Sequence, residues 1–236
     1  MFVCVKKKQV ALVGLLVVII LASVILMNFS SKTEYVYTIP KSKYTVVIDA
    51  GHGGIDGGSV GKNTGVFESD LNLAFSKNLA HQLNNFGISV VMTRMDEGGL
   101  YDKSATNLKR SEMKKRQSII ETSNADMVIS IHMNSFPLQS PRGAQAFYKA
   151  NDEMSFILAQ DVQQELSNQI DYAKENAKVG DYYILNCTAT PSVLVECGFL
   201  SNPQEEVLLQ NKDYQEKFCY ALCCGIIKYL NENEQQ

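Results

Sequence analysis

Short apolar runs alternate with amphipathic stretches along the chain from residue 44 onward. Apolar runs bounded by turn residues are typical of buried strands, whereas apolar residues that recur every three or four positions predict helices. The predicted strands are 44–48, 88–93, 127–131, 144–148, 182–185 and 192–196, and the predicted helices are 68–86, 108–123, 154–166 and 214–230. Asn202, followed by Pro203 and then Glu205, predicts one more helix start. This alternation predicts a single α/β domain with a mostly parallel twisted sheet and helices on both faces.

The first thirty residues follow a different pattern. Lys6, Lys7 and Lys8 precede the uncharged apolar stretch 10–27. As a helix, this stretch spans roughly 27 Å, close to the ~30 Å of a bilayer's hydrocarbon core. We therefore expect residues 1–30 to form an N-terminal transmembrane anchor, with a cleaved signal segment as the alternative, and residues 31–43 to link it to a domain at 44–236. The three lysines place the N-terminus in the cytoplasm and the domain outside.

The charge balance limits the partners of the exported part. With those three lysines left out of the 22 basic residues, 19 basic residues stand against 25 acidic ones, a net charge of −6. This balance argues against nucleic acid as a partner and against electrostatic adhesion to anionic polymers. A basic run from Lys109 to Arg116 lies in a predicted helix, where a solvated face is expected.

The cysteines predict neither a disulfide framework nor a thiolate metal site. Five of the six cysteines follow the apolar segment, which is an odd number, and no Cys-x-x-Cys pair occurs. Cys219 and Cys223 lie one turn apart in an apolar helical stretch, so we expect buried thiols.

A glycine-rich loop after the first predicted strand carries His52, one of three histidines in the chain. Glycine permits positive φ angles and a close approach of the backbone to whatever the histidine contacts. Phosphate-binding patterns do not fit, because they require glycine at the position of Asp56, and the P-loop also requires Ser or Thr at Asn63. A ligand role for His52 is therefore favoured.

Three polar side chains end or directly follow predicted strands: His52, His132 and Glu196. Adjacent parallel strands bring such residues together in a crevice at the carboxyl edge of the sheet. Glu68 stands at the predicted N-terminus of the first helix. Two histidines and a carboxylate with a vacant fourth position are the ligands of a catalytic zinc site, and a second carboxylate can transfer protons there. Helical His-x-x-x-His spacing is absent. The residue types alone therefore do not decide whether these side chains bind a metal ion or only stabilise the fold.

Four motifs follow one another between residues 46 and 209: Asp49-Ala50-Gly51-His52-Gly53-Gly54, Glu68 ahead of a helix, Ser130-Ile131-His132-Met133-Asn134, and Val195-Glu196-Cys197-Gly198-Phe199-Leu200-Ser201-Asn202. In content and order they resemble the motifs of the zinc-dependent N-acetylmuramoyl-L-alanine amidases. The resemblance implies that His52, Glu68 and His132 bind Zn²⁺ and that Glu196 is catalytic. It also implies cleavage of the amide between the muramic acid lactyl group and L-alanine in peptidoglycan.

The short form, with an N-terminal anchor and no wall-binding repeats, most resembles the sporulation and germination branch of that family. Those amidases strip peptides so that muramic lactam forms in the spore cortex. The resemblance thus implies a cell-membrane protein with an extracytoplasmic catalytic domain, facing the forespore intermembrane space in a sporulating cell. Cell-division members plug the zinc site with a helical insertion, for which residues 133–142, with two prolines, are too short. We therefore expect the activity to be controlled by the timing of synthesis, by zinc affinity or by an exported accessory protein.

Three further positions carry expectations from the residues or the resemblance. Many members have Arg at the position of Asn186, which leaves one contact to the substrate peptide open. Arg116 matches a frequent family position and is expected to form a structural ion pair. Asp49 either orients His52 or caps the turn after the strand.

Two other functions stay open on the sequence. The chain could be a membrane-tethered, non-catalytic peptidoglycan-binding module, or another zinc hydrolase of the cell wall, such as a carboxypeptidase or deacetylase. Glu196 argues against the first, since a binding module does not require a strand-end carboxylate opposite the metal. Analysis of the products released from intact cell wall distinguishes the second from an amidase.

Overall fold

The computed structural model describes residues 43–233. The predicted anchor at 1–30 and all but the last residue of the predicted linker lie outside the described residues. Within residues 43–233, no helix is both long and apolar enough to cross a membrane.

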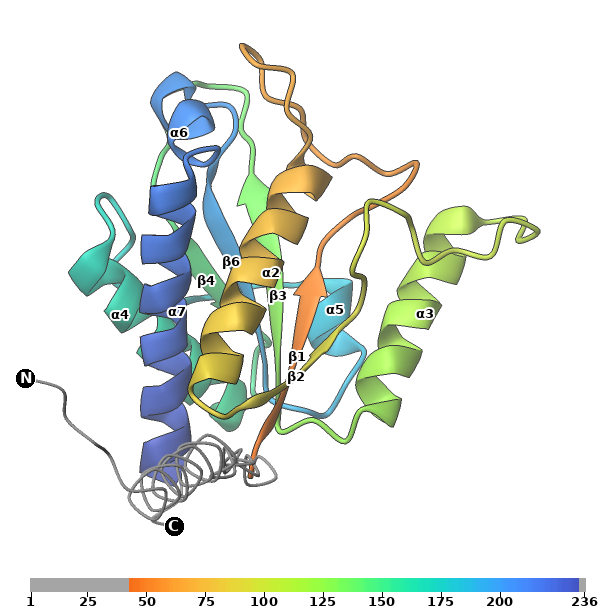
Figure 1. Cartoon of the computed structure of the whole chain (residues 1–236), viewed down its shortest axis with the longest axis vertical. Coiled ribbons are helices and arrows are strands. Elements are labelled where there is room, and N and C mark those ends of the chain that lie inside the picture. The colour runs from red at the N-terminus through yellow and green to blue at the C-terminus, as the bar shows by residue number, and fades with distance from the viewer. Residues whose placement is uncertain (1–42, 234–236) are drawn as a thin grey trace, which may run out of the picture. The chain divides into compact units, whose positions relative to one another are not determined.

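A six-stranded sheet in the order β2-β1-β3-β6-β4-β5 forms the centre of the described region (Figure 1). Its strands are β1 (Thr45–Ala50), β2 (Ser89–Met92), β3 (Met127–Asn134), β4 (Gln145–Tyr148), β5 (Lys178–Val179) and β6 (Ser192–Phe199). Strands β2, β1, β3 and β6 are parallel, but β4 runs antiparallel to β6. The sheet is therefore mixed rather than simply parallel. Only residues 135–144 separate β3 from β4, too few for the crossover that a parallel strand needs.

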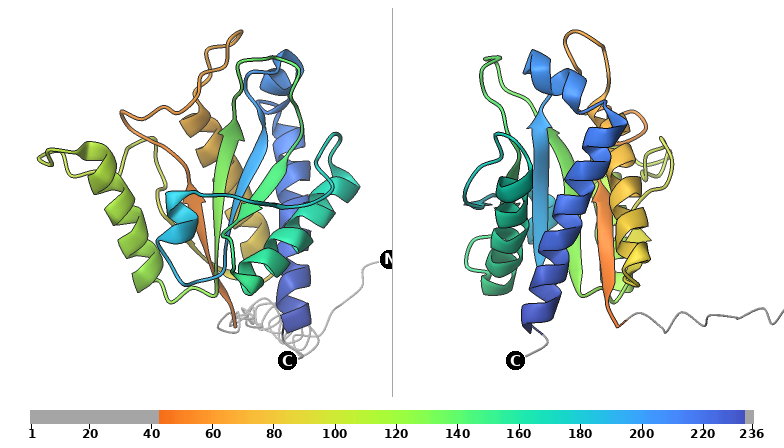
Figure 2. Two further views of the ribbon diagram at one scale, coloured as in Figure 1. Left: turned by 180° about the vertical axis from the view of Figure 1, so that it is seen from behind. Right: turned by 60° about the vertical axis from the view of Figure 1, so that its left-hand side comes forward.

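Helices cover both faces of this sheet, as the sequence predicts. They are α2 (Glu68–Asn85), α3 (Leu108–Thr122), α4 (Glu153–Gln169), α5 (Tyr183–Asn186), α6 (Pro203–Leu208) and α7 (Lys212–Asn233). The larger core lies between one sheet face and α2, α4 and α7, where Phe75 and Phe218 meet edge to face. A smaller core lies on the other face, where Ile120 of α3 and Ile184 of α5 pack against Val128. Seen from behind, α5 lies in front of the strands (Figure 2).

The predicted strand at 182–185 is wrong, because these residues enter and form the short helix α5. A run of four apolar or aromatic residues does not distinguish a strand from a buried turn of helix. Tertiary packing decides here, since Ile184 and Leu185 fill the smaller core. Strand β5 was not predicted, because both of its residues are exposed and carry no apolar alternation.

Other local predictions are confirmed. The Asn202 side chain accepts hydrogen bonds from the backbone N–H groups of Gln204 and Glu205, at 3.0 and 3.2 Å, and so begins α6. All cysteines in the described part of the chain are free thiols, and Cys219 and Cys223 are fully buried.

The buried guanidinium of Arg116 binds the carboxyl end of β1. Nη1 of Arg116 lies 2.5 Å from Oδ1 of Asp49, and Nη2 lies 2.6 Å from Oε1 of Glu112. The same group donates to the carbonyl oxygens of Ala50 and His52. Burial alone would raise the pKa of Asp49, but the charge of Arg116 holds it below its ordinary value. The predicted structural ion pair of Arg116 is confirmed.

A second buried arginine, Arg94, holds the same loop from the side of β2. It donates to the carbonyl oxygens of Ala50 and Gly51, each at 3.0 Å, and of Ser69 at 2.7 Å. Burial and the neighbouring Arg116 lower the pKa of Arg94. Because Ser69 lies in the first turn of α2, Arg94 ties the loop after β1 to the start of that helix. Sequence reasoning missed this residue, although a polar residue just after a strand at the same sheet edge was the available signal.

We predict that Arg116→Met destabilises the fold by about 3–5 kcal/mol, because it leaves Asp49 and Glu112 as buried, uncompensated carboxylates. The free energy of unfolding, measured by urea denaturation at neutral pH, tests this. Lys115→Met is the matched control, since the neighbouring Lys115 is exposed. Its free energy of unfolding should stay within about 0.5 kcal/mol of that of the unsubstituted chain. Equal losses in the two variants would contradict a stabilising role for the buried pair.

The same pair predicts an acid-dependent term in stability. The pKa of Asp49 is lower in the folded chain than its ordinary value of 3.8. The ionised Asp49 therefore stabilises the fold fully above pH 3.8, and this stabilisation is lost as the pH falls from 3.8 through the lowered folded-state pKa. Unfolding measured between pH 7 and pH 3 should show a smaller acid dependence in Asp49→Asn than in the unsubstituted chain. Identical pH profiles would show that Asp49 has no shifted pKa.

Candidate metal centre

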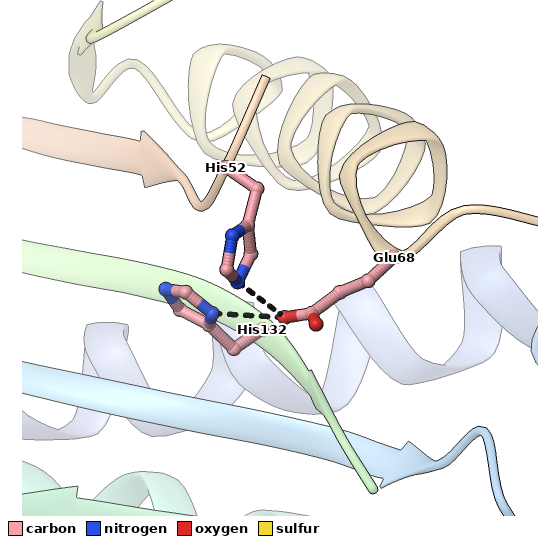
Figure 3. Close-up of side chains that lie close together, drawn as sticks. All are labelled: His52, Glu68 and His132. Atoms are coloured by element: carbon pink, nitrogen blue, oxygen red, sulfur yellow. Dashed lines mark hydrogen bonds and ion pairs between the residues drawn. The ribbon is translucent and has the colours of Figure 1, made fainter. Parts of the chain in front are cut away.

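His52, Glu68 and His132 converge from three different elements (Figure 3). Nε2 of His52 lies 3.1 Å from Oε1 of Glu68, and Nδ1 of His132 lies 3.0 Å from the same oxygen. All three ligand atoms lie within 4.8 Å of one another. His52 follows β1, Glu68 opens α2 and His132 belongs to β3, so the fold brings together three residues that the sequence keeps apart.

The backbone around His52 is specialised for presenting its ring. His52 has a φ of +60°, an uncommon left-handed conformation for a residue with a side chain. Its carbonyl oxygen is fixed by Arg116 at 2.5 Å. A Cβ atom at the preceding Gly51 would lie 2.3 Å from Cε1 of His132. Glycine at position 51 is therefore what lets the two imidazole rings approach each other.

Asp56, rather than Asp49, faces the outer nitrogen of the His52 ring. Nδ1 of His52 lies 2.9 Å from Oδ1 of Asp56, within ion-pair distance but without the alignment of a hydrogen bond. Lys109 pairs with the other oxygen of Asp56. Asp49 instead binds Arg116, so the alternative in which Asp49 orients His52 is wrong. Sequence reasoning used Asp56 only to exclude phosphate-binding loops and missed this contact.

Glu68 is held in place by backbone donors on both of its oxygens. Oε2 accepts from the N–H of Ser59 at 2.8 Å, and Oε1 accepts from the N–H of Met133 at 3.3 Å. Burial alone would raise the pKa of Glu68, but the hydrogen bonds and charges of His132 and His52 place it well below the ordinary value. The group is thus a preoriented carboxylate at the positive N-terminus of α2.

These three residues fit a small divalent cation. Two imidazole nitrogens and one carboxylate oxygen face a common point, which leaves room for a fourth ligand, as in three-residue catalytic metal sites. The outer nitrogen of His52 faces a carboxylate, as is usual for metal-binding histidines. Within residues 43–233, this trio is the group of His, Cys, Asp or Glu side chains whose geometry suits a metal ion.

Glu196 lies beside the three residues on the neighbouring strand. Its Cα pairs with that of His132 across β3 and β6, so the two side chains project from the same face of the sheet. Glu196 is 8 % exposed, and its Oε2 has no hydrogen-bond partner among the described residues. Burial, with a contribution from the negative charge of Glu68, raises the pKa of Glu196 to about 7. Such a carboxyl group can both take up and release a proton near neutral pH.

A groove of about 1090 Å³ contains this cluster. Its lining includes Arg110 and Lys114 of α3, Tyr183 of α5 and Tyr182, which directly precedes α5. Residues 135–142, which connect β3 to β4, contain no helix.

The structure also describes two other features that the sequence singles out, the basic run and Asn186. The basic run is not a uniformly solvated face, because Arg116 is buried and Lys109, Arg110 and Lys114 line the groove. The Asn186 amide donates to Oδ1 of Asp181 at 2.8 Å.

Comparison with known proteins agrees with this geometry. The sequence pattern of the N-acetylmuramoyl-L-alanine amidases matches residues 46–228. The germination-specific N-acetylmuramoyl-L-alanine amidase of Bacillus subtilis (strain 168) is 33% identical over 232 residues, which cover 96% of this chain and 97% of that protein.

Solved structures of amidases share the fold. The CwlD amidase from Clostridioides difficile, determined in complex with the GerS lipoprotein, is 38% identical with a TM-score of 0.77, and the match covers 80% of this chain and 99% of that one. The catalytic domain of CwlV from Bacillus (Paenibacillus) polymyxa var. colistinus is 30% identical with a TM-score of 0.71, and covers 80% and 98% respectively. On the sequence pattern, the relatives and the shared fold, the chain belongs to the N-acetylmuramoyl-L-alanine amidase family.

Proposed function

We propose that this amidase hydrolyses the bond between N-acetylmuramic acid and L-alanine in peptidoglycan with a Zn²⁺ ion held by His52, Glu68 and His132. The observation that carries the proposal is the convergence of these ligand atoms within 4.8 Å of one another, in the groove that Glu196 also lines. Two histidines and one carboxylate are an established ligand set of catalytic zinc.

The protein residues divide the chemical work. When bound, Zn²⁺ polarises the scissile carbonyl and lowers the pKa of water. The ligand carboxylate of Glu68 is already ionised and fixed by the backbone N–H groups of Ser59 and Met133, so the site is preorganised. Asp56 and Lys109 hold the outer side of His52, which keeps Nε2 directed at the shared point.

Glu196 is assigned the proton-transfer role. Its unpartnered Oε2 accepts a proton from the attacking water, and the resulting carboxylic acid returns that proton to the departing amine nitrogen of L-alanine. A buried carboxyl group with a pKa of about 7 suits both directions of transfer. A non-catalytic binding module has no need of such a residue, because leaving a buried carboxylate oxygen unpaired costs free energy.

We further propose that the enzyme acts at the cell membrane during sporulation, where peptide removal allows muramic lactam to form in the spore cortex. Similarity to a germination-specific amidase over 96% of this chain supports the role. The uncharged stretch 10–27 after three lysines supports an anchor, with the catalytic domain outside the cytoplasm and facing the forespore intermembrane space. The relative solved with the GerS lipoprotein supports an exported accessory protein as a partner.

We predict that His52→Ala and His132→Ala each lose most bound zinc, because each removes one of three protein ligands. Zinc per chain, measured by plasma mass spectrometry after dialysis, tests this. His81→Ala is the matched control, since His81 is exposed on α2, and it should keep one zinc ion. Stoichiometric zinc in both ligand variants would place the metal elsewhere.

We predict that Glu196→Gln keeps zinc but lowers turnover by about 10²–10⁴-fold, because glutamine preserves size and polarity but accepts no proton. Mass spectrometry of digested peptidoglycan, with free L-alanine amino termini as the readout, measures the loss and also separates an amidase from a carboxypeptidase or deacetylase. Glu153→Gln, at an exposed position of α4, is the control. A Glu196→Gln enzyme with normal turnover at neutral pH would remove Glu196 from the mechanism.

A further inference from the structure

The wall of the groove formed by α3 carries positive charge. Lys109, Arg110 and Lys114 all line the groove that contains the metal ligands. The next residue, Lys115, is exposed but does not line it. The cations on this helix are therefore divided between the groove and the outer surface.

Four cationic side chains of α3 line the groove, because the buried Arg116 does so too, and only Lys109 and Arg116 have carboxylate partners. Lys109 pairs with Asp56, which itself faces His52. Within residues 43–233, Arg110 and Lys114 take part in none of the ion pairs. Glu112, which lies between them in sequence, is buried and bound by Arg116. Two positive charges thus line the groove without an ion-pair partner among the described residues.

The stability of α3 does not explain this arrangement. Lys109 and Arg110 stand in the first turn of α3, which contains no acidic residue, and cations are unfavourable at that end of the helix dipole. Arg110 and Lys114 are also four residues apart, where like charges repel on a helix surface. The helix dipole and the repulsion between the two cations both destabilise α3. An anion bound in the groove offsets both effects, because it attracts the two cations.

The substrate of the proposed function supplies such an anion. A peptide joined to muramic acid through its amino terminus has no charged amino terminus, and its chain leads away from the scissile amide to a free carboxylate. A peptide of this kind carries negative charge at a distance from the bond that is cut. The wall of α3 lies beside the metal ligands in one groove, where this part of the peptide has to be accommodated.

The other side of this part of the groove is fixed to α3. The hydroxyl of Tyr183, on α5, donates to Oε1 of Gln117, on α3, at 2.9 Å. Tyr182 lines the same groove and contacts Phe147 edge to face. Tyr182 and Tyr183, at the start of α5, and the cations of α3 therefore form one connected surface of polar and apolar groups, suited to an extended peptide with acidic groups.

We propose that Arg110 and Lys114 form a subsite for the carboxylates of the peptidoglycan stem peptide. This subsite rests on the proposed function, because it assumes that the peptide lies along α3 while its amide is at the metal centre. The two side chains contribute charge and are exposed, so they act mainly on substrate affinity and remain sensitive to salt.

The test compares two substrates and three forms of the full-length chain in detergent with saturating zinc. The substrates are an N-acetylmuramoyl peptide with free carboxylates and the same compound with every carboxylate converted to a carboxamide. For the double variant Arg110→Gln/Lys114→Gln, we expect kcat/KM on the free-carboxylate substrate to fall by about tenfold, mostly through KM, as two screened surface ion pairs supply. Its kcat/KM on the amidated substrate should equal that of the unsubstituted enzyme. Lys115→Gln should change neither value.

Two kinetic outcomes count against the subsite. An unchanged kcat/KM on the free-carboxylate substrate, or an equal loss on both substrates, would overturn it. If the unsubstituted enzyme cleaves neither substrate, the proposed function fails, and calorimetric binding of the free stem peptide then tests the subsite separately. Weaker binding by the double variant, but not by Lys115→Gln, would support it in that case, and equal binding by all three forms would overturn it.

Discussion

The structure depends on two guanidinium groups buried at the carboxyl end of β1. Arg116 and Arg94 together take up the carbonyl oxygens of three consecutive residues, from Ala50 to His52. Carbonyl groups in a buried loop need donors, and two rigid guanidinium groups supply several donors in fixed directions. The loop after β1 therefore has one path, and that path sets the position of the His52 ring. Because Asp49 balances the charge of Arg116, the same interaction also fastens α3 to the sheet.

The sheet then determines how the remaining groups meet. His132 and Glu196 are partners in adjacent parallel strands, so one register places a proposed metal ligand and the proposed proton carrier side by side. Their immediate neighbours in β3 and β6, such as Cys197, point into the larger core on the opposite face. The groove opens on the other face, beyond the smaller core of α3 and α5. Burial at this position both orients Glu196 and raises its pKa toward neutrality.

Net charge and local charge differ in this protein, and the difference bears on its substrate. Residues 9–236 contain more acidic than basic residues, which argues against general adhesion to anionic polymers. The wall of the groove at α3 nevertheless has unpaired cations, because Arg116 binds the nearby carboxylates Asp49 and Glu112, and Lys109 binds Asp56. A protein can therefore be acidic overall and still favour anionic groups at one site.

The sequence by itself determined the class of fold, the location of most elements, and the four residues that gather in the groove. Apolar periodicity, the Asn202 cap and the polar residues at strand ends are local signals, and local propensities and the geometry of parallel sheets suffice to interpret them. The joint role of the four residues came from the resemblance of four motifs to a known family. The direction of β4, the helical conformation of Tyr183–Asn186 and the clamp made by Arg94 were decided only by the tertiary structure. Each depends on contacts between segments that are distant in the sequence. Strand β4 pairs with β6 and runs back because its connection to β3 is short. Ile184 and Leu185 fill an apolar face of the sheet, and Arg94 donates to buried carbonyl groups of the loop after β1. The partner of the His52 ring was likewise decided by the tertiary structure. Both Asp49 and Asp56 lie close to His52 in the sequence, but Asp49 binds Arg116, and the path of the loop brings Asp56 to the ring.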